Sequence, residues 1–307
     1  MMKYFELTKN VLVFKNVLKD ASKTYRIIKK SQQINNNVFP EWRIWNQHGG
    51  LKCVINPNTI SDQDSDAVEF IKELRNITAN CFKEYKPYID IEYLKQFDID
   101  PYYTLPNFEE NFLFTFEASA TTGGWGISSF LIGDYLDIKT TSKDGLMYGY
   151  HLDRTPHWGT PPYAYSLNIY PNDNFEGGGI YFINMETAEK KISENGIEYY
   201  LIDEPICYEP EAGDAIVFPS CQFHATKETK NGQKTFIRIH LESPQPNSYI
   251  EEIKNMNENE ILLKKEKAFK ECLENYNHCA NIYPNENLIN MSIYQNTKFI
   301  VRNKAVD

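Results

Sequence analysis

The sequence lacks the patterns that identify several common classes of protein. No stretch approaches the roughly 18 consecutive apolar residues that a membrane-spanning helix needs. The N-terminus has no apolar run of the kind found in a signal peptide. The six cysteines include no Cys-x-x-Cys pair and do not suggest a disulfide framework in a chain of 307 residues. We therefore expect a cytoplasmic protein that does not enter a membrane.

Positive charge and several catalytic motifs are also scarce. The chain has 32 basic and 42 acidic residues, a net charge of −10 and a pI of about 5.2. This balance argues against nucleic acid or an anionic membrane surface as the main partner. The phosphate-binding spacings G-x-G-x-x-G and G-x-x-x-x-G-K, the serine elbow G-x-S-x-G and the zinc motif H-E-x-x-H are absent. A nucleotide-binding loop, a serine hydrolase and a zinc hydrolase of that type are therefore disfavoured.

What is present favours a folded chain with two kinds of secondary structure. Hydrophobic residues make up 41% and aromatic residues 14%, enough for a substantial core. Residues 4–18 are strand-like and residues 18–33 have a cationic helical pattern. The strongest predicted helix spans about 63–86, where apolar residues recur at helical spacing: Val68, Ile71, Leu74, Ile77 and Cys81.

From residue 112 onward, short β-branched and aromatic runs alternate with turns. The predicted strands are 112–117, 127–138, 147–153, 164–170, 179–184, 197–202, 214–218 and 234–241. Such spacing favours a sandwich or a double-sheet barrel. Residues 249–279 read as helical again, and the Asn-rich tail from Pro284 reads as irregular. We expect an α-rich N-terminal part packed on the core (1–110), a β-rich catalytic core (111–247), and a C-terminal helical extension and tail (248–307).

One group of residues has the composition of a metal site. His151-Leu152-Asp153 places an imidazole and a carboxylate on one face of a strand, because strand side chains alternate. A distant His224 follows a Pro-x-x-Gly-Asp turn and a buried apolar strand, and antiparallel pairing can bring it beside the first two. Two histidines and one carboxylate form the facial triad of non-haem iron oxygenases, which leaves coordination positions open.

These landmarks resemble a known family, the Fe(II)- and 2-oxoglutarate-dependent dioxygenases, in their prolyl-4-hydroxylase-like branch. The shared order is His-x-Asp, a Tyr-bearing strand with Tyr170, a Gly-Gly turn, a Pro-x-x-Gly-Asp strand, the distal histidine, and the basic residue Lys234 about ten positions later. The match covers roughly residues 148–241, about a third of the chain. One landmark is missing: where relatives often carry a tyrosine about ten positions before His-x-Asp, this sequence has Lys139-Thr140-Thr141.

The resemblance implies an α+β protein with a double-stranded β-helix core (jelly-roll, cupin-like) and flanking helices. It implies Fe(II) held by His151, Asp153 and His224, which are then the catalytic residues, and 2-oxoglutarate and O₂ as cosubstrates. The far carboxylate of 2-oxoglutarate would meet Lys234 and Tyr170. Arg238 lies on the same strand face as Lys234 and could bind this carboxylate instead. The spacing from the distal histidine favours Lys234 over Arg238 as the anchor.

Asp153 also bears on the type of reaction. Related halogenases replace this carboxylate so that a halide can bind the iron, so its presence favours hydroxylation, with release of succinate and CO₂. Desaturation or cyclisation at the same iron stays open, because the ligand set does not determine the fate of the substrate radical. For the unidentified primary substrate, a small molecule (an amino acid or small acid) is favoured over a peptide of the prolyl type. Two other classes stay open: a non-catalytic β-barrel binding protein and a zinc-dependent hydrolase. Nothing in the sequence indicates an oligomeric state.

Overall fold

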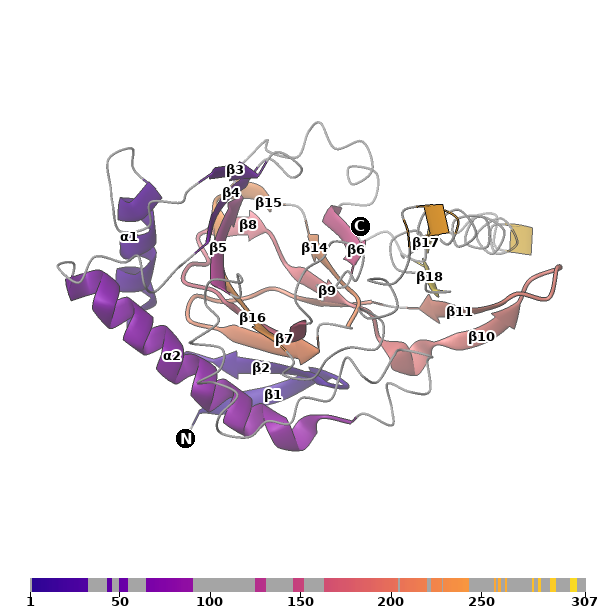
Figure 1. Cartoon of the computed structure of the whole chain (residues 1–307), viewed down its shortest axis with the longest axis horizontal. Coiled ribbons are helices and arrows are strands. Elements are labelled where there is room, and N and C mark those ends of the chain that lie inside the picture. The colour runs from indigo at the N-terminus through magenta and orange to yellow at the C-terminus, as the bar shows by residue number, and fades with distance from the viewer. Residues whose placement is uncertain are drawn as a thin grey trace.

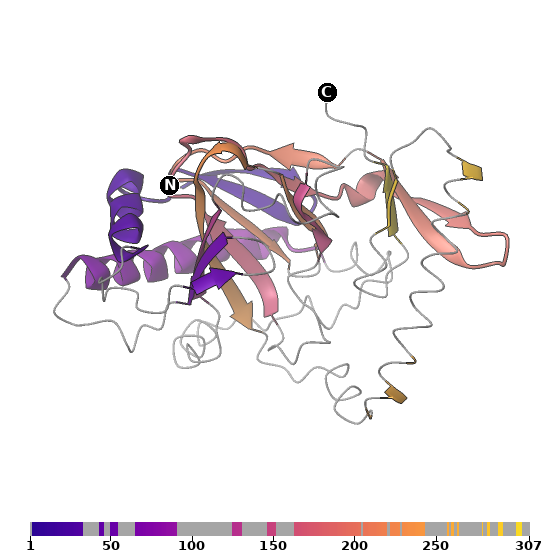
Figure 2. The ribbon, with the colours of Figure 1, turned by 90° about the horizontal axis from the view of Figure 1, so that it is seen from above.

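The structure is a computed structural model. It describes residues 2–32, 43–45, 50–54, 65–90, 125–130, 146–151, 163–242 (without 204, 220, 221 and 228), 288–290 and 299–302, with isolated residues between 257 and 282. For the strands at 43–45, 50–54, 125–130 and 146–151 it describes the backbone. Strands far outnumber helices in these residues, as Figures 1 and 2 show. No helix among them combines the length and the apolar character needed to cross a membrane.

The largest unit is an eight-stranded antiparallel sheet in which the N-terminal strands pair with strands of the 163–242 region. In spatial order its strands are β1 (Lys3–Thr8), β2 (Val11–Lys15), β13 (Ala215–Pro219), β7 (Tyr163–Ile169), β16 (Lys234–Glu242), β5 (Trp125–Phe130), β4 (Gly50–Val54) and β3 (Arg43–Trp45). The predicted strand-like stretch 4–18 is thus a hairpin, and Asn10 at its turn adopts a φ of 65°, a conformation that asparagine tolerates. The apolar run of β2 is fully buried, because both faces of the sheet are covered.

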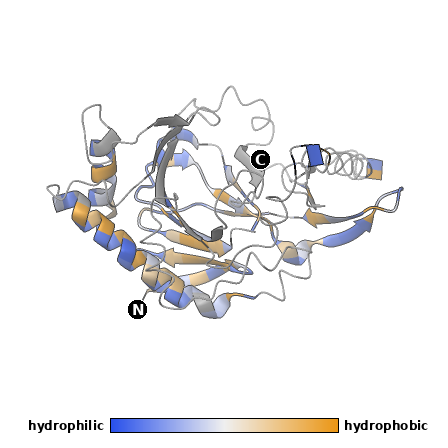
Figure 3. Cartoon of the chain, viewed as in Figure 1, coloured by the Kyte–Doolittle hydropathy of each residue, from blue (hydrophilic) through white to orange (hydrophobic). Residues whose placement is uncertain are grey.

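Two helices cover one face of this sheet. They are α1 (Ala21–Gln32) and α2 (Ser65–Tyr85), followed by a short 3₁₀ turn, η1 (Lys86–Tyr88). The periodic apolar residues of α2, including Leu74 and Cys81, pack on outward-facing strand residues such as Leu167 and Ile239. Charged residues of α2 take the opposite side, so its ribbon alternates between the two hydropathy colours (Figure 3). Both predicted N-terminal helices are confirmed.

A smaller sheet lies against the other face. Its order is β12 (Ile206–Tyr208), β9 (Ile180–Phe182), β14 (His224–Lys227) and β6 (Leu146–His151). A second apolar cluster joins the two sheets, with Val13, Ile216 and Phe236 from the large sheet and Ile180 and Phe182 from the small one. We call the space between these two sheets the interior. On β16, residues 234, 236 and 238 alternate onto the interior face, whereas Ile237 and Ile239 pack toward the helices.

The remaining strands correct one prediction. A third sheet has the order β10 (Glu189–Ile192), β11 (Glu198–Asp203), β18 (Phe299–Arg302) and β17 (Leu288–Asn290). Its β10–β11 hairpin extends away from the two central sheets (Figure 1), and η5 (Met185–Thr187) precedes it. The tail from Pro284 was predicted to be irregular, which is wrong for β17 and β18. Parallel pairing of β18 with β11 buries Ile300, a long-range contact that the local composition does not reveal.

Most of the remaining strand predictions agree with the structure, and some predicted elements lie outside the described residues. The predicted strands correspond to β5, β6, β7, β9, β11, β13 and β16, with residues 131–138 of the predicted strand 127–138 outside the described residues. A two-stranded sheet of β8 (Phe175–Gly177) and β15 (Thr229–Gly232) was not predicted, because such short strands show little periodicity. Residues 112–117 and most of 249–279 lie outside the described residues. The N-terminal part supplies strands to the large sheet as well as helices. The domain boundaries at 110 and 247 stay predictions.

Candidate active site

The pairing of β6 with β14 brings two of the predicted metal ligands together in the fold. The strands are antiparallel, and the register places His151 directly opposite His224. Directly opposite residues of an antiparallel pair share one face of the sheet and are its closest cross-strand neighbours. On its other side, His224 pairs with Phe182 of the interior cluster. This register therefore assigns positions 151 and 224 to the interior face, although they are far apart in the sequence.

The His224 ring is held in an orientation suited to a metal ligand. The side chain is buried, and its Nδ1 lies 3.0 Å from the carbonyl oxygen of Gln222, to which an Nδ1–H donates. That hydrogen bond fixes the tautomer in which Nε2 carries the lone pair, as in many metal-binding histidines. The Phe218 ring lies 4.7 Å from the imidazole and the Phe182 ring 6.1 Å, measured between centroids. Together these contacts fix the plane of the ring.

Asp153, the predicted carboxylate ligand, lies outside the described residues, two positions beyond the end of β6. Of His151, the structure gives the backbone and its register. Among the side chains that the structure does describe, no three histidine, cysteine, aspartate or glutamate residues come together as a metal site. The role of His151, Asp153 and His224 as iron ligands therefore stays a prediction, with the register of β6 and β14 as its structural support.

Lys234 begins β16 and points its ammonium group into the interior. Its side chain is 1% exposed, and its Nζ lies 5.6 Å from the Tyr170 ring centroid and 5.4 Å from that of Phe236. Within the described part of the chain, the ammonium has no hydrogen-bond or ion-pair partner. Burial lowers the pKa of Lys234 to about 7, against the opposing effect of Glu209 and Cys207. A buried cation in this position favours an anionic ligand.

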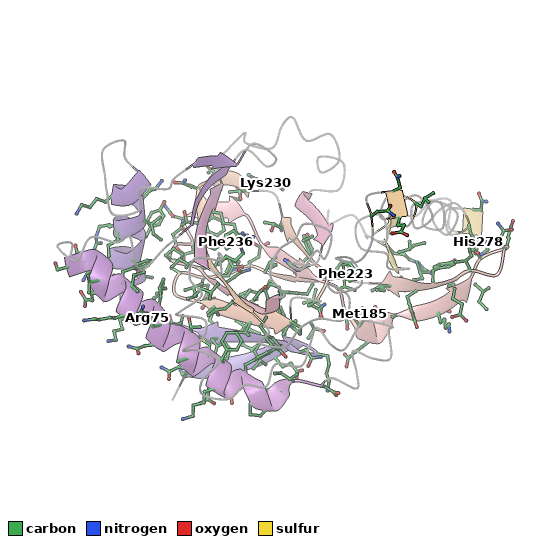
Figure 4. The ribbon with its side chains drawn as sticks, in the orientation of Figure 1. Arg75, Met185, Phe223, Lys230, Phe236 and His278 are labelled. Atoms are coloured by element: carbon green, nitrogen blue, oxygen red, sulfur yellow. The ribbon has the colours of Figure 1, made fainter. Side chains whose placement is uncertain are left out.

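The other predicted cosubstrate residues lie on the same interior face. Tyr170 follows β7 directly, is 1% exposed and lies beside Phe236, with 6.0 Å between ring centroids. Arg238 is half-buried and pairs with Asn168 in the β7–β16 ladder. Figure 4 shows Phe236 well apart from Phe223. Tyr170 lies beside Lys234, whereas four residues earlier on the chain Ser166 pairs with Phe218, whose ring lies beside His224. The interior thus has a cationic end and a histidine end.

A glycine turn gives the lysine side chain its space. Gly177 and Gly178 have φ values of 74° and 68°, the left-handed conformation that glycine adopts without strain. A Cβ atom on Gly178 would lie 3.0 Å from the Cδ of Lys234 and 2.9 Å from a ring atom of Phe175. The Gly-Gly turn expected from the sequence precedes β9, and in the structure it packs on Lys234.

One feature of the site region was not predicted. The Lys15 ammonium lies 2.6 Å from the Asp214 carboxylate, which is fully buried and also accepts a 2.6 Å hydrogen bond from the Tyr208 hydroxyl. The backbone N–H of Glu211 donates to the same oxygen at 2.9 Å. Burial and the contact with Asp214 raise the pKa of Tyr208 to about 12. This network holds the Pro-x-x-Gly-Asp turn at the start of β13; its long-range partner on β2 leaves no local signal in the sequence.

Comparison with known proteins finds similar solved structures. No protein-family model matches the sequence, and no curated protein matches it. Similar solved structures include a prolyl-4-hydroxylase of Pseudomonas putida, with 12% identity and a TM-score of 0.40 over 78% of this chain and 95% of that chain. A prolyl 4-hydroxylase of Phytophthora capsici has 12% identity and a TM-score of 0.44 over 87% of this chain and 69% of that one. An auxin-oxidising dioxygenase of Arabidopsis thaliana, in complex with 2-oxoglutarate, has 10% identity and a TM-score of 0.42 over 77% and 84%.

Proposed function

We propose that the protein is an Fe(II)- and 2-oxoglutarate-dependent oxygenase whose two central sheets are the halves of a double-stranded β-helix. The observation that carries the proposal is the register of β6 and β14, which pairs His151 with His224 on the interior side. Asp153 follows in the His-x-Asp order of the facial triad. The two sheets enclose a shared apolar cluster, as the halves of a jelly roll do.

The residues fit an iron ion at the histidine end. His151, Asp153 and His224 would hold it, and the hydrogen bond from the His224 Nδ1–H to the Gln222 carbonyl presents Nε2 as the ligand atom. When bound, the iron supplies the oxygen chemistry that converts 2-oxoglutarate to succinate and CO₂ and hydroxylates an unactivated C–H bond. The retained carboxylate of Asp153 favours hydroxylation over halogenation, because no ligand position is vacated for a halide.

The residues fit 2-oxoglutarate at the cationic end. Its far carboxylate would pair with the Lys234 ammonium, which is otherwise buried without an anionic partner among the described residues. Tyr170 lies against the same ammonium and would contact the same carboxylate. A charge-assisted contact in an enclosed site is stronger than in water, so one lysine suffices as an anchor.

For the primary substrate we propose a small molecule, an amino acid or a small acid. The support for this choice is Arg238, which alternates onto the interior face of β16 and is half-buried, so that its guanidinium could bind a carboxylate of a small acid. A peptidyl substrate is the alternative that the same assay tests.

The experiment separates binding from turnover. Anaerobic protein is mixed with Fe(II) and 2-oxoglutarate, and we expect a visible absorption band from the metal–oxo acid complex; oxygen is then added and succinate is measured. A panel of amino acids, small acids and prolyl peptides should contain a compound that stimulates succinate release, with the small compounds ahead of the peptides. A band without succinate across the panel would indicate a binding protein. Absence of both would contradict the oxygenase assignment.

A further inference from the structure

Gln222 is a buried amide two residues before the distal histidine. Its residue is 3% exposed, and its main-chain carbonyl oxygen accepts the hydrogen bond from the His224 Nδ1–H at 3.0 Å. The main-chain N–H of Gln222 donates to the Pro219 carbonyl at 2.8 Å, which closes a turn at the end of β13. The main chain of Gln222 is therefore tied on one side to the large sheet and on the other to the imidazole.

The Gln222 side chain ties the same residue to the small sheet. Its Nε2 donates to the Ile183 carbonyl at 3.0 Å and lies 3.3 Å from the Phe223 carbonyl. The Phe223 carbonyl also accepts from the Ile183 N–H at 3.1 Å, which extends the β9–β14 ladder by one residue pair. In Figure 4, the labelled Phe223 and Met185 mark the two chain segments that meet here. The Gln222 amide thus joins the segment before His224 to the end of β9.

The segment that accepts this hydrogen bond is itself held in place. Ile183 is 1% exposed, and Asn184 after it caps the 3₁₀ turn η5, where its Oδ1 accepts from the Glu186 N–H at 3.2 Å. The Thr187 hydroxyl at the other end of η5 donates to the Asp203 carbonyl at 2.5 Å. The Ile183 carbonyl is therefore a fixed acceptor, and a donor bound to it is fixed as well.

We propose that Gln222 is a positioning residue of the metal site, whose side chain holds its own carbonyl where the His224 Nδ1–H can donate to it. This inference rests on the proposed function, because it takes His224 as a metal ligand. Without the amide donor, the Gln222 carbonyl loses the contact with Ile183 that fixes its direction. It then no longer selects the tautomer of His224 that leaves the Nε2 lone pair for a metal.

A purely structural amide is the alternative, and the two roles differ in their effect on His224. A structural amide would only satisfy two buried carbonyls and stabilise the fold, as buried hydrogen bonds do. A positioning amide also determines which ring nitrogen of His224 carries the proton and how well the other nitrogen binds a metal. The test therefore measures the tautomer, the metal affinity and the stability separately.

The first measurement needs no metal. Protein labelled with nitrogen-15 in its histidines is studied by NMR at pH 8, where the nitrogen shifts report the tautomer, and His224→Gln identifies the signal. Gln222→Met removes the donor at similar length. Tyr85→Phe is the matched control, because the buried Tyr85 hydroxyl also donates to a main-chain carbonyl, that of Asn10 at 2.6 Å, on the helix-covered side of the large sheet.

The second measurement is an anaerobic titration with Co(II), whose visible absorption reports its ligands. Gln222→Met should convert His224 from the Nδ1–H tautomer to a mixture and should weaken Co(II) binding by roughly tenfold, as the loss of contacts that orient a ligand histidine does. Tyr85→Phe should leave the tautomer unchanged and the Co(II) constant within about twofold. Both variants should lower the melting temperature, because each removes a buried hydrogen bond.

A Gln222→Met variant that kept the pure Nδ1–H tautomer, or that melted earlier but bound Co(II) as tightly as the unaltered protein, would show that Gln222 is structural only. If Gln222→Met does not fold, Gln222→Asn takes its place, since it keeps an amide but is one methylene shorter and cannot span to Ile183; the same outcomes decide. If the unaltered protein bound no Co(II), the proposed function would fail, whereas the tautomer comparison would still decide the role of Gln222 toward His224.

Discussion

The affinity for 2-oxoglutarate should depend on pH through Lys234. In the unliganded site, burial lowers the pKa of this lysine to about 7. A bound carboxylate restores the charged form, so above pH 7 binding must be accompanied by uptake of a proton. The dissociation constant should be nearly constant below pH 7 and should rise by about tenfold per pH unit above it, which gives about a tenfold weaker complex at pH 8 than at pH 6.

The lowered pKa of Lys234 also predicts how the stability of the unliganded protein depends on pH. A lysine has an ordinary pKa of 10.5, and the folded value is about 7. Between these values the unfolded chain binds more protons than the folded one, so the free energy of unfolding rises with pH. The destabilisation is complete at and below pH 7, where the difference corresponds to up to about 5 kcal/mol at about 1.4 kcal/mol per pH unit, and it disappears as the pH rises to 10.5. Lys234→Met should therefore stabilise the unliganded protein most at neutral and acidic pH, as measured by urea unfolding.

The binding assay is the anaerobic absorption titration between pH 6 and 8.5. Fe(II) is kept saturating so that protonation of the ligand histidines does not change the measured dissociation constant of 2-oxoglutarate. Lys234→Met should weaken binding and remove the pH dependence. Lys234→Arg is the matched control, because a guanidinium stays charged throughout the range and should also give a flat profile. A dissociation constant of the unaltered protein that did not change from pH 6 to 8 would refute the reasoning, as would a pH dependence that persisted in Lys234→Met.

Three further substitutions probe other parts of the site. Asp153→Ala removes the predicted carboxylate ligand and should abolish succinate formation; succinate release at the unaltered rate would exclude Asp153 from the iron site. Asp214→Ala leaves the Tyr208 hydroxyl and the Glu211 N–H without their acceptor, although Lys15 keeps its ion pair with Glu211, and should lower the free energy of unfolding by about 2 kcal/mol in urea; an unchanged unfolding curve would show that the network contributes nothing. Gly178→Ala, at φ +68° with contacts of 2.9–3.0 Å, should destabilise the fold and weaken 2-oxoglutarate binding, whereas Gly196→Ala, at φ +81° in open space, should show the backbone effect alone; equal effects of the two on binding would contradict the packing argument.

Much of the local structure could be predicted from the sequence. The periodic apolar residues of α2, such as Leu74 and Cys81, determine which side of the helix is buried, and β2 is apolar along its length because it lies inside a covered sheet. These predictions succeed because periodicity and apolar runs report burial directly. The strands β17 and β18 could not be predicted in this way, since β18 pairs with β11, about a hundred positions away, and β17 joins the sheet through β18.

For the candidate site, too, some features follow from the sequence and others only from the tertiary structure. By itself, the sequence determined the residue types and their order: His151, Asp153, His224 and Lys234, in the sequence typical of an iron oxygenase. Only the tertiary structure decided that residues 151 and 224 are register partners and that Lys234 is buried without an anionic partner in the described fold. Only the fold, likewise, placed Asn168, whose Oδ1 has no hydrogen-bond partner among the described residues, beside Arg238 on the interior face. The physical reason is that residue type sets what chemistry is possible, whereas strand register and burial set which groups meet and what state of charge they adopt.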